Sequence, residues 1–261
     1  MARMRWVFAF LLTVSLAAPR QVCAQADEIQ VYDGGLAPVG TFNLTLHNNF
    51  TPKGEKIPAF PGAVVPDKSL NGVPEFALGV TPWFEAGLYL PLYSRDKTAG
   101  WGLDGFKLRT LFAVPGADAR RFVYGANVEF SYNARRWDTK RFTSEIRPIV
   151  GWHLAPIDII VNPILDTAYD GVKNLVFAPS ARVSYTVRRG WAIAVEEYAD
   201  YGPLRRFRSA GEQAHQLYGV IDANVRGWDV EAGVGGGLTH HSDRLTLKLI
   251  LARDLATFWK R

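Results

Sequence analysis

The sequence predicts an all-β fold, a transmembrane antiparallel up-and-down β-barrel of about 12 strands with short periplasmic turns and longer extracellular loops. Three observations predict it. The chain begins with a secretory signal, its period-two apolar runs are about ten residues long, and the connections between runs alternate between short and long. No later stretch reaches the ~20 apolar residues of a spanning helix, so strands must make any membrane crossing.

Residues 1–24 have the pattern of a cleaved signal peptide. Arg3 and Arg5 precede an apolar run from Trp6 to Ala18, and Val22-Cys23-Ala24 offers a cleavage site. The single cysteine leaves with this segment, so the mature chain has no disulfide framework. Three of the 30 Lys and Arg residues leave as well, against 25 Asp and Glu. The mature net charge of about +2 does not indicate a nucleic-acid partner.

The rest of the chain divides into three parts. Residues 25–40 form an N-terminal segment on the periplasmic side, residues 41–255 the barrel, and residues 256–261 a C-terminal tail. Two placements of the N-terminal segment stay open, because its residues fit either a cap on the periplasmic mouth or a segment that enters the barrel.

Alternation of apolar and polar residues defines the strands. In residues 122–133, Phe122, Tyr124, Val128 and Phe130 occupy one face, and residues such as Glu129 occupy the other. The twelve predicted strands are 41–50, 73–81, 84–93, 103–114, 122–133, 143–154, 158–166, 175–187, 191–201, 214–225, 228–237 and 244–254. Prolines lack the ladder N–H, so they predict a bulge, a kink or a different strand boundary at Pro74, Pro91, Pro148, Pro163 and Pro179.

The connections between these strands fall into two groups. Short turns are expected at 81–83, 115–121, 155–157, 188–190 and 226–227. Longer loops are expected at 51–72, 94–102, 134–142, 167–174, 202–213 and 238–243. Segregated loop lengths are typical of outer-membrane barrels.

Aromatic residues gather near both strand ends, as expected for rings in the two headgroup regions. The predicted aromatic girdle comprises Trp83, Trp152, Trp191, Trp228, Tyr93, Tyr132 and Tyr201. The large apolar face of nearly every strand is then expected to contact lipid, and the polar face to line the lumen. The predicted lumen residues are Lys107, Arg109, Glu129, Glu145, Arg147, Arg182, Glu196, Asp222, Glu231 and Lys248.

The hairpin at 182–202 gives the most specific register. A three-residue turn with Gly190 at positive φ pairs Val187 with Trp191. Tyr185 then lies opposite Ile193, Val183 opposite Val195, and Arg182 opposite Glu196. The last pair is predicted to point into the barrel.

Three stretches, EIQVYDG (28–34), FNLTLHNNF (42–50) and TPWFEAGLYLPLY (81–93), resemble the opening of a known family. Its members are bacterial outer-membrane β-barrel proteins described as transporters and related to proteins linked to the phenol meta-cleavage pathway. The resemblance implies the fold and an outer-membrane location, and it points to small hydrophobic or aromatic solutes. The chain departs from the usual barrel pattern at its C-terminus, which ends Phe258-Trp259-Lys260-Arg261 rather than on an aromatic residue.

No catalytic residues, metal site or cofactor are expected. His215 and Ser144 face outward on strands whose neighbours carry no nucleophile or base for them, and Ser209 lies in a loop. Adjacent His240 and His241 point apart on an extended segment, which does not favour a shared metal ion.

The expected partners are outer-membrane lipid, lipopolysaccharide, the barrel-assembly machinery and a small-molecule solute. Basic loop residues could meet lipopolysaccharide phosphates or form a solvated rim, namely Arg135, Arg136, Lys140, Arg141, Arg205, Arg206 and Arg208. The predicted function is that of a monomeric, non-enzymatic, passive channel for small molecules in the outer membrane of a Gram-negative bacterium. Two alternatives stay open: an outer-membrane enzyme acting on lipid or lipopolysaccharide, and a non-conducting structural barrel.

Overall fold

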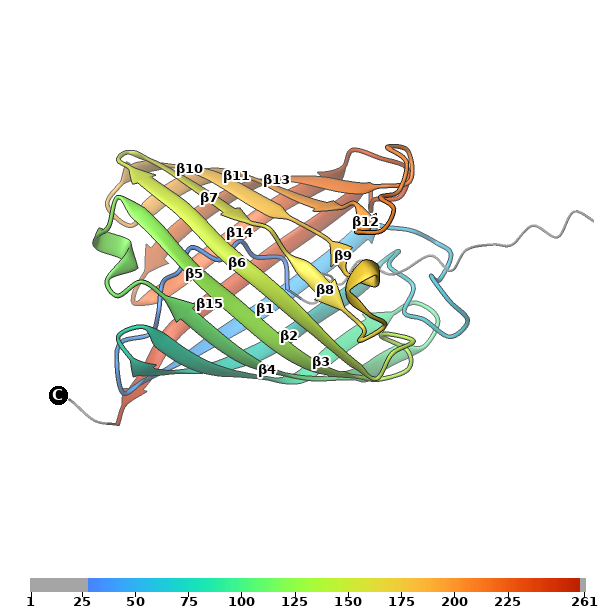
Figure 1. Cartoon of the computed structure of the whole chain (residues 1–261), viewed down its shortest axis with the longest axis horizontal. Coiled ribbons are helices and arrows are strands. Elements are labelled where there is room, and N and C mark those ends of the chain that lie inside the picture. Colours follow the sequence, from blue (N-terminus) through green and yellow to red (C-terminus); the bar gives the residue numbers. More distant parts are fainter. Residues whose placement is uncertain (1–27, 259–261) are drawn as a thin grey trace, which may run out of the picture.

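The chain forms one closed antiparallel barrel with 12 strand positions around its wall. The computed structural model describes residues 28–258, so the predicted signal peptide and the last three residues lie outside the described part. Figure 1 shows the strands tilted around a single axis. The strands are β1 (Thr41–Lys53), β2 (Ser69–Thr81), β3 (Phe84–Asp96), β4 (Gly100–Ala113), β5 (Phe122–Asn133), β6 (Phe142–Leu154), β7 (Ile157–Asn162), β8 (Leu165–Thr167), β9 (Val176–Phe177), β10 (Ser180–Arg188), β11 (Trp191–Asp200), β12 (Gly202–Pro203), β13 (Ala214–Val225), β14 (Trp228–Gly237) and β15 (Leu245–Thr257). Pairing of β1 with β15 closes the sheet, and the barrel ends two residues later than predicted.

Two predicted strands are broken at their prolines. Pro163 separates β7 from β8, and Pro179 separates β9 from β10, because proline has no N–H to give to the ladder. The wall continues across the break: β6 pairs with both β7 and β8, and the Ala178 N–H donates to the Ile164 carbonyl at 3.0 Å.

The other three prolines lie inside strands. β2 and β3 shift register between Gly72 and Glu75, and β3 and β4 shift between Tyr89 and Leu92. These bulges surround Pro74 and Pro91, as predicted. Pro148 differs, because it pairs with Ala126 in an uninterrupted register.

The connections have different lengths at the two ends of the barrel. Most connections at one end, called the long-loop end, are long. They comprise residues 54–68, 134–141, 168–175, 204–213 and 238–244. The other end, the short-turn end, lies on the left in Figure 1 and carries the short helix η1 (Ala117–Ala119). The predicted long loop at 94–102 is wrong: only 97–99 stay outside the strands. There the Asp96 carboxylate accepts the Thr98 and Ala99 N–H groups at 2.6 and 2.7 Å, which forms a tight turn.

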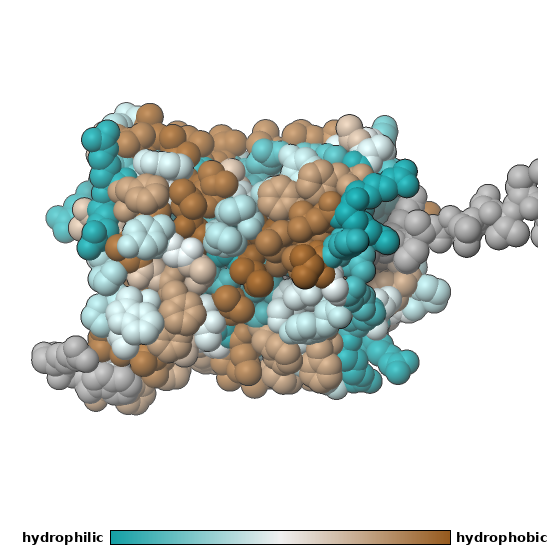
Figure 2. All heavy atoms as spheres, viewed as in Figure 1, coloured by the Kyte–Doolittle hydropathy of each residue, from teal (hydrophilic) through white to brown (hydrophobic). Residues whose placement is uncertain are grey.

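The barrel is apolar outside and polar inside. On β5, the side chain of Val128 is 37% exposed, whereas its neighbour Glu129 is 1% exposed. Figure 2 shows apolar residues across the middle of the visible wall and hydrophilic residues gathered at the long-loop end. Within residues 28–258, no helix is long and apolar enough to cross a membrane.

The β10–β11 hairpin confirms the predicted pairs. Tyr185 pairs with Ile193, Val183 with Val195, and Arg182 with Glu196. Gly190 has the predicted positive φ, 74°. The predicted pairing of Val187 with Trp191 is wrong, because a register shift leaves Val187 unpaired and places Arg188 opposite Trp191. The turn is therefore one residue tighter than predicted.

The N-terminal segment enters the barrel. Glu28, Ile29, Val31 and Tyr32 are buried, and the blue trace in Figure 1 runs through the interior toward the short-turn end. Residues 28–38 are called the plug below. Of the two placements left open, entry into the barrel applies to residues 28–32, whereas Gly40 hydrogen-bonds to Gly79 near the short turn after β2. A periplasmic position for the whole of 25–40 is corrected to this extent, and residues 25–27 lie outside the described part.

Candidate functional site: the charged interior

The predicted lumen residues lie on the inner face of the wall. Seven of them are buried: Lys107, Arg109, Glu129, Glu145, Arg147, Glu196 and Lys248. Arg182, Asp222 and Glu231 are half-buried and form ion pairs with one another or with this group. Together with partners that the sequence analysis missed, they form three networks.

The first is the Arg182 network, made of Arg182, Glu196, Asp222, Glu231 and Lys248. The Arg182 guanidinium forms ion pairs with Glu196, with Asp222, and at 3.1 Å with Glu231. The Lys248 ammonium forms an ion pair with Glu196 and another with Glu231 at 2.6 Å. Period-two alternation on five neighbouring strands, β10, β11, β13, β14 and β15, brings these residues together. Its two cations and three carboxylates neutralise one another almost completely.

The second is the Arg147 network, made of Glu28, Lys107, Glu129, Glu145 and Arg147. Arg147 donates to Glu145 at 2.6 Å, and Lys107 lies 3.4 Å from Glu129. Glu28 of the plug lies 3.7 Å from Arg147. The wall residues of this network were predicted, whereas Glu28 was not assigned to any strand.

The third is the Arg109 network, made of His47, Glu75, Glu85 and Arg109. Arg109 forms ion pairs with Glu75 at 2.6 Å and with Glu85, and His47 Nε2 lies 3.2 Å from Glu75. Of these residues only Arg109 was predicted. Glu75 alternates with the buried Val73 and Ala77 on β2, and this period-two pattern could have identified it as an inward-facing residue.

All three networks contact the plug. Arg147 donates to the Gln30 carbonyl at 2.9 Å, Lys248 to the Ile29 carbonyl at 3.2 Å, and Glu85 accepts the Ala37 N–H at 2.5 Å. Charged donors and acceptors on the wall therefore satisfy backbone groups of a segment that belongs to no strand.

Tyr32 of the plug contacts the wall through its ring, its hydroxyl and its backbone. Its ring lies between the Arg109 and Arg147 guanidiniums, whose Cζ atoms are 5.5 and 4.6 Å from the ring centroid. Its hydroxyl is 2.5 Å from that of Tyr89, and its backbone exchanges two hydrogen bonds with the Asn162 amide at 2.7 and 2.9 Å. The interior around it is filled rather than open.

The predicted girdle residues lie near the strand ends, with outward-facing rings. Trp83 stacks on Phe112 at the short-turn end, with ring centroids 6.1 Å apart. At the long-loop end, Tyr132 accepts a hydrogen bond from Arg141 at 2.6 Å. The other members are Tyr93, Trp152, Trp191, Tyr201 and Trp228.

The residues considered for catalysis have other partners. His215 Nδ1 lies 3.0 Å from Glu197 and its Nε2 lies 3.1 Å from Gln213. The Ser209 hydroxyl donates to Glu212 at 2.8 Å, and the Ser144 hydroxyl lies 2.5 Å from that of Tyr169.

The His240–Asp243 loop shows no metal-ligand geometry. The Asp243 carboxylate accepts the Glu55 N–H at 2.9 Å, and burial raises the pKa of this carboxyl group. No group of three or more His, Cys, Asp or Glu side chains that could hold a metal ion occurs within residues 28–258.

Two of the basic loop residues point toward acidic partners of the wall. Arg136 lies 3.1 Å from Asp104 and 3.3 Å from Asp96. Arg208 lies 2.6 Å from Asp200. These two guanidiniums are engaged with protein carboxylates, which reduces their use for an external anion.

Comparison with known proteins gives the fold but no family. No family model matches the chain, and no curated protein sequence matches it. The structure is similar to that of an outer membrane channel from Pseudomonas putida F1, with a TM-score of 0.57, 12% identity, and coverage of 87% of this chain and 100% of that chain. It is also similar to the KdgM porin in complex with disordered oligogalacturonate, with a TM-score of 0.52, 6% identity, and coverage of 82% and 99%. The chain thus has the fold of outer-membrane β-barrel channels.

Proposed function

We propose that this protein is a passive channel for small molecules in the outer membrane of a Gram-negative bacterium. The observation that carries the proposal is the charged interior enclosed by an apolar wall. Charged side chains inside a structural core are costly unless they are paired, whereas a water-containing path requires polar groups along its length. The fold shared with the two channels supports the same function.

In this proposal, the barrel with the plug inside it is the closed state of the channel. Tyr32, Glu28 and the backbone of residues 29–37 occupy the space between the three networks. The plug is held by polar contacts, by the Tyr32 ring and by the packing of Ile29 and Val31 against the wall, rather than by a strand ladder. It can therefore move without breaking the barrel.

The wall also favours a class of solute. In each network carboxylates outnumber the Lys and Arg side chains, so the lumen favours cations and neutral molecules over anions. The sequence resemblance supports small hydrophobic or aromatic solutes. A small aromatic molecule that is neutral or cationic satisfies both arguments.

Conductance in planar bilayers tests the proposal. The purified full-length mature protein is compared with a variant lacking residues 28–36. We expect small or rare openings for the intact chain, and conductance several-fold larger for the deletion. Heat-modifiable migration on a detergent gel serves as the control for folding of both barrels.

A non-conducting structural barrel is the second candidate, because the interior side chains are almost completely buried. If the folded deletion variant passes no current and no solute, the channel proposal is wrong and this second candidate is correct.

A further inference from the structure

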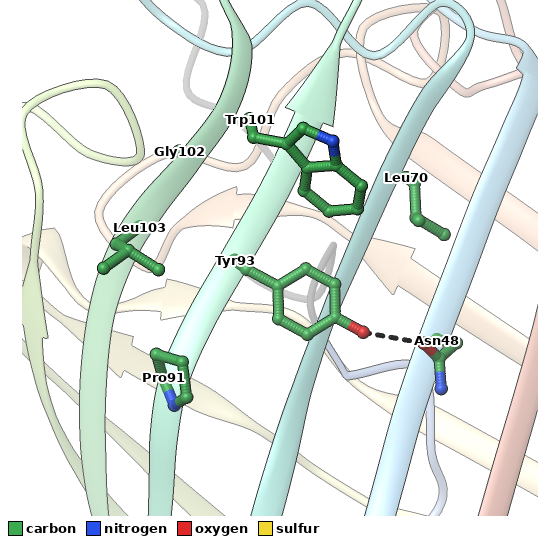
Figure 3. A pocket seen from close by; sticks show the side chains of 7 residues that line it. All are labelled: Asn48, Leu70, Pro91, Tyr93, Trp101, Gly102 and Leu103. Carbon is green, nitrogen blue, oxygen red and sulfur yellow. Dashed lines mark hydrogen bonds between the residues drawn. The ribbon is translucent and has the colours of Figure 1, made fainter.

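A recess lies on the outer, lipid-facing side of the wall, separate from the charged interior. It has a volume of about 600 Å³ and opens outward across β1 to β4. Its lining residues are Asn48, Leu70, Pro91, Tyr93, Trp101, Gly102 and Leu103. Figure 3 shows the Tyr93 ring lying across the strands, with Trp101 and Leu70 on one side of it and Pro91 on the other.

Gly72 makes this arrangement possible. The register places Asn48, Gly72, Tyr93 and Leu103 in one row across the four strands. Because Gly72 has no side chain, Tyr93 lies over β2 and its hydroxyl donates to the side-chain amide oxygen (Oδ1) of Asn48 at 2.7 Å. A Cβ atom on Gly72 would come within 2.6 Å of the Tyr93 hydroxyl and 2.3 Å of the His47 carbonyl.

The recess extends inward from the rim at the long-loop end. Leu70, Arg95 and Trp101 form the next row toward that rim, one residue before the end of β3. Pro91 lies four residues deeper, about 13 Å along an extended strand. The recess therefore spans the depth from the headgroup region into the acyl chains.

Two hydrogen-bond donors, the side chains of Arg95 and Asn48, lie along the recess. The Arg95 guanidinium carbon is 6.0 Å from the Trp101 ring centroid, and no acidic side chain of residues 28–258 forms an ion pair with it. The Asn48 Nδ2 group has no hydrogen-bond acceptor within the described part of the chain. A cation at headgroup depth and an amide donor below it suit a lipid phosphate and an acyl-linkage carbonyl.

We propose that this recess binds one molecule of lipid A, the phosphorylated membrane anchor of lipopolysaccharide. Arg95 contacts a phosphate, Asn48 donates to an acyl carbonyl, and one acyl chain lies against Tyr93, Trp101 and Leu103. The proposal rests on the outer-membrane location proposed above. The long-loop end of such a barrel faces the cell exterior, where the outer leaflet supplies lipid A rather than glycerophospholipid.

The chain contains a matched control site. Arg253 lies over the Trp228 ring at 5.5 Å, which is the same type of contact beside the short 226–227 turn. That end faces the opposite leaflet. Arg253→Gln therefore removes the same chemistry without touching the recess.

Native mass spectrometry of the full-length mature protein in detergent tests the proposal, with titrations of bisphosphorylated lipid A, dephosphorylated lipid A and phosphatidylglycerol. We expect one tightly bound lipid A. Arg95→Gln should weaken its binding about tenfold, the loss expected for one charge-assisted hydrogen bond. Asn48→Leu should weaken it about threefold, and Arg253→Gln should leave it unchanged.

Three results would overturn the proposal: unchanged lipid A binding in Arg95→Gln, equal losses in Arg95→Gln and Arg253→Gln, or phosphatidylglycerol binding as tight as that of lipid A. Heat-modifiable migration of each variant confirms its folding. Bilayer conductance is measured separately, so failure of lipid A binding and failure of channel activity are distinguishable.

Discussion

The two sides of the lumen hold their charges in different ways. On the β10–β15 side, Arg182 and Lys248 are matched almost completely by wall carboxylates and contact the plug through one hydrogen bond to Ile29. On the β3–β6 side, Arg109 and Arg147 also enclose Tyr32 of the plug. We infer that the charges of the first side mainly stabilise the barrel, where the plug is held by the apolar packing of Ile29 and Val31, whereas the charges of the second side hold the plug directly.

Arg182→Gln tests the first half of this comparison and should have the largest effect. It leaves three carboxylates facing Lys248 alone, so we expect a loss of about 3 kcal/mol in the free energy of unfolding. Urea unfolding followed by tryptophan fluorescence measures it. Conductance of the refolded variant should stay that of the wild type.

The control is the double variant Arg182→Met with Asp222→Leu. It removes one unpaired carboxylate, so it should be more stable than Arg182→Gln. A wild-type unfolding free energy for Arg182→Gln would contradict a stabilising role for the Arg182 network.

Tyr32→Ala tests the second half. It removes two cation–π contacts and one hydroxyl contact, together about 2 kcal/mol, so the ratio of closed to open channel should fall about thirtyfold. Single-channel recording measures the open fraction. Stability should change little, because every contact between wall strands is kept.

Tyr32→Phe separates the contributions to closure. It keeps the ring between the two guanidiniums and loses only the contact with Tyr89, so its open fraction should lie between those of the wild type and Tyr32→Ala. An open fraction of Tyr32→Ala equal to that of the wild type would show that the plug is not held by this ring.

Ion selectivity is the smallest expected effect and concerns both sides together. Since carboxylates exceed Lys and Arg on each side, the open channel should pass K⁺ a few-fold better than Cl⁻. The reversal potential across a KCl gradient, measured on the variant lacking residues 28–36, tests this. Glu129→Gln with Glu231→Gln should lower the preference, and a preference for Cl⁻ would refute the charge argument.

Regular strands were predicted from the sequence, whereas the bulged ones were not. On β10 and β11 the period-two pattern placed Arg182 opposite Glu196, because each inner residue is followed by an outer one. On β3, Tyr89 and Leu92 both face inward although three positions separate them, because the bulge at Leu90 and Pro91 adds a residue. The prolines indicated where the period-two alternation would be interrupted, but not which residues beyond the interruption would face inward.

The sequence by itself determined the barrel, its strand order, its apolar outer face and most of its inner charges, because alternation and turn residues act between neighbours along the chain and across one ladder. Only the tertiary structure decided that residues 28–38 enter the lumen, that Glu75 and Glu85 share Arg109, and that Gly72 leaves room for the recess under Tyr93. These features depend on contacts between residues far apart in the chain, which barrel closure brings together and no local pattern encodes.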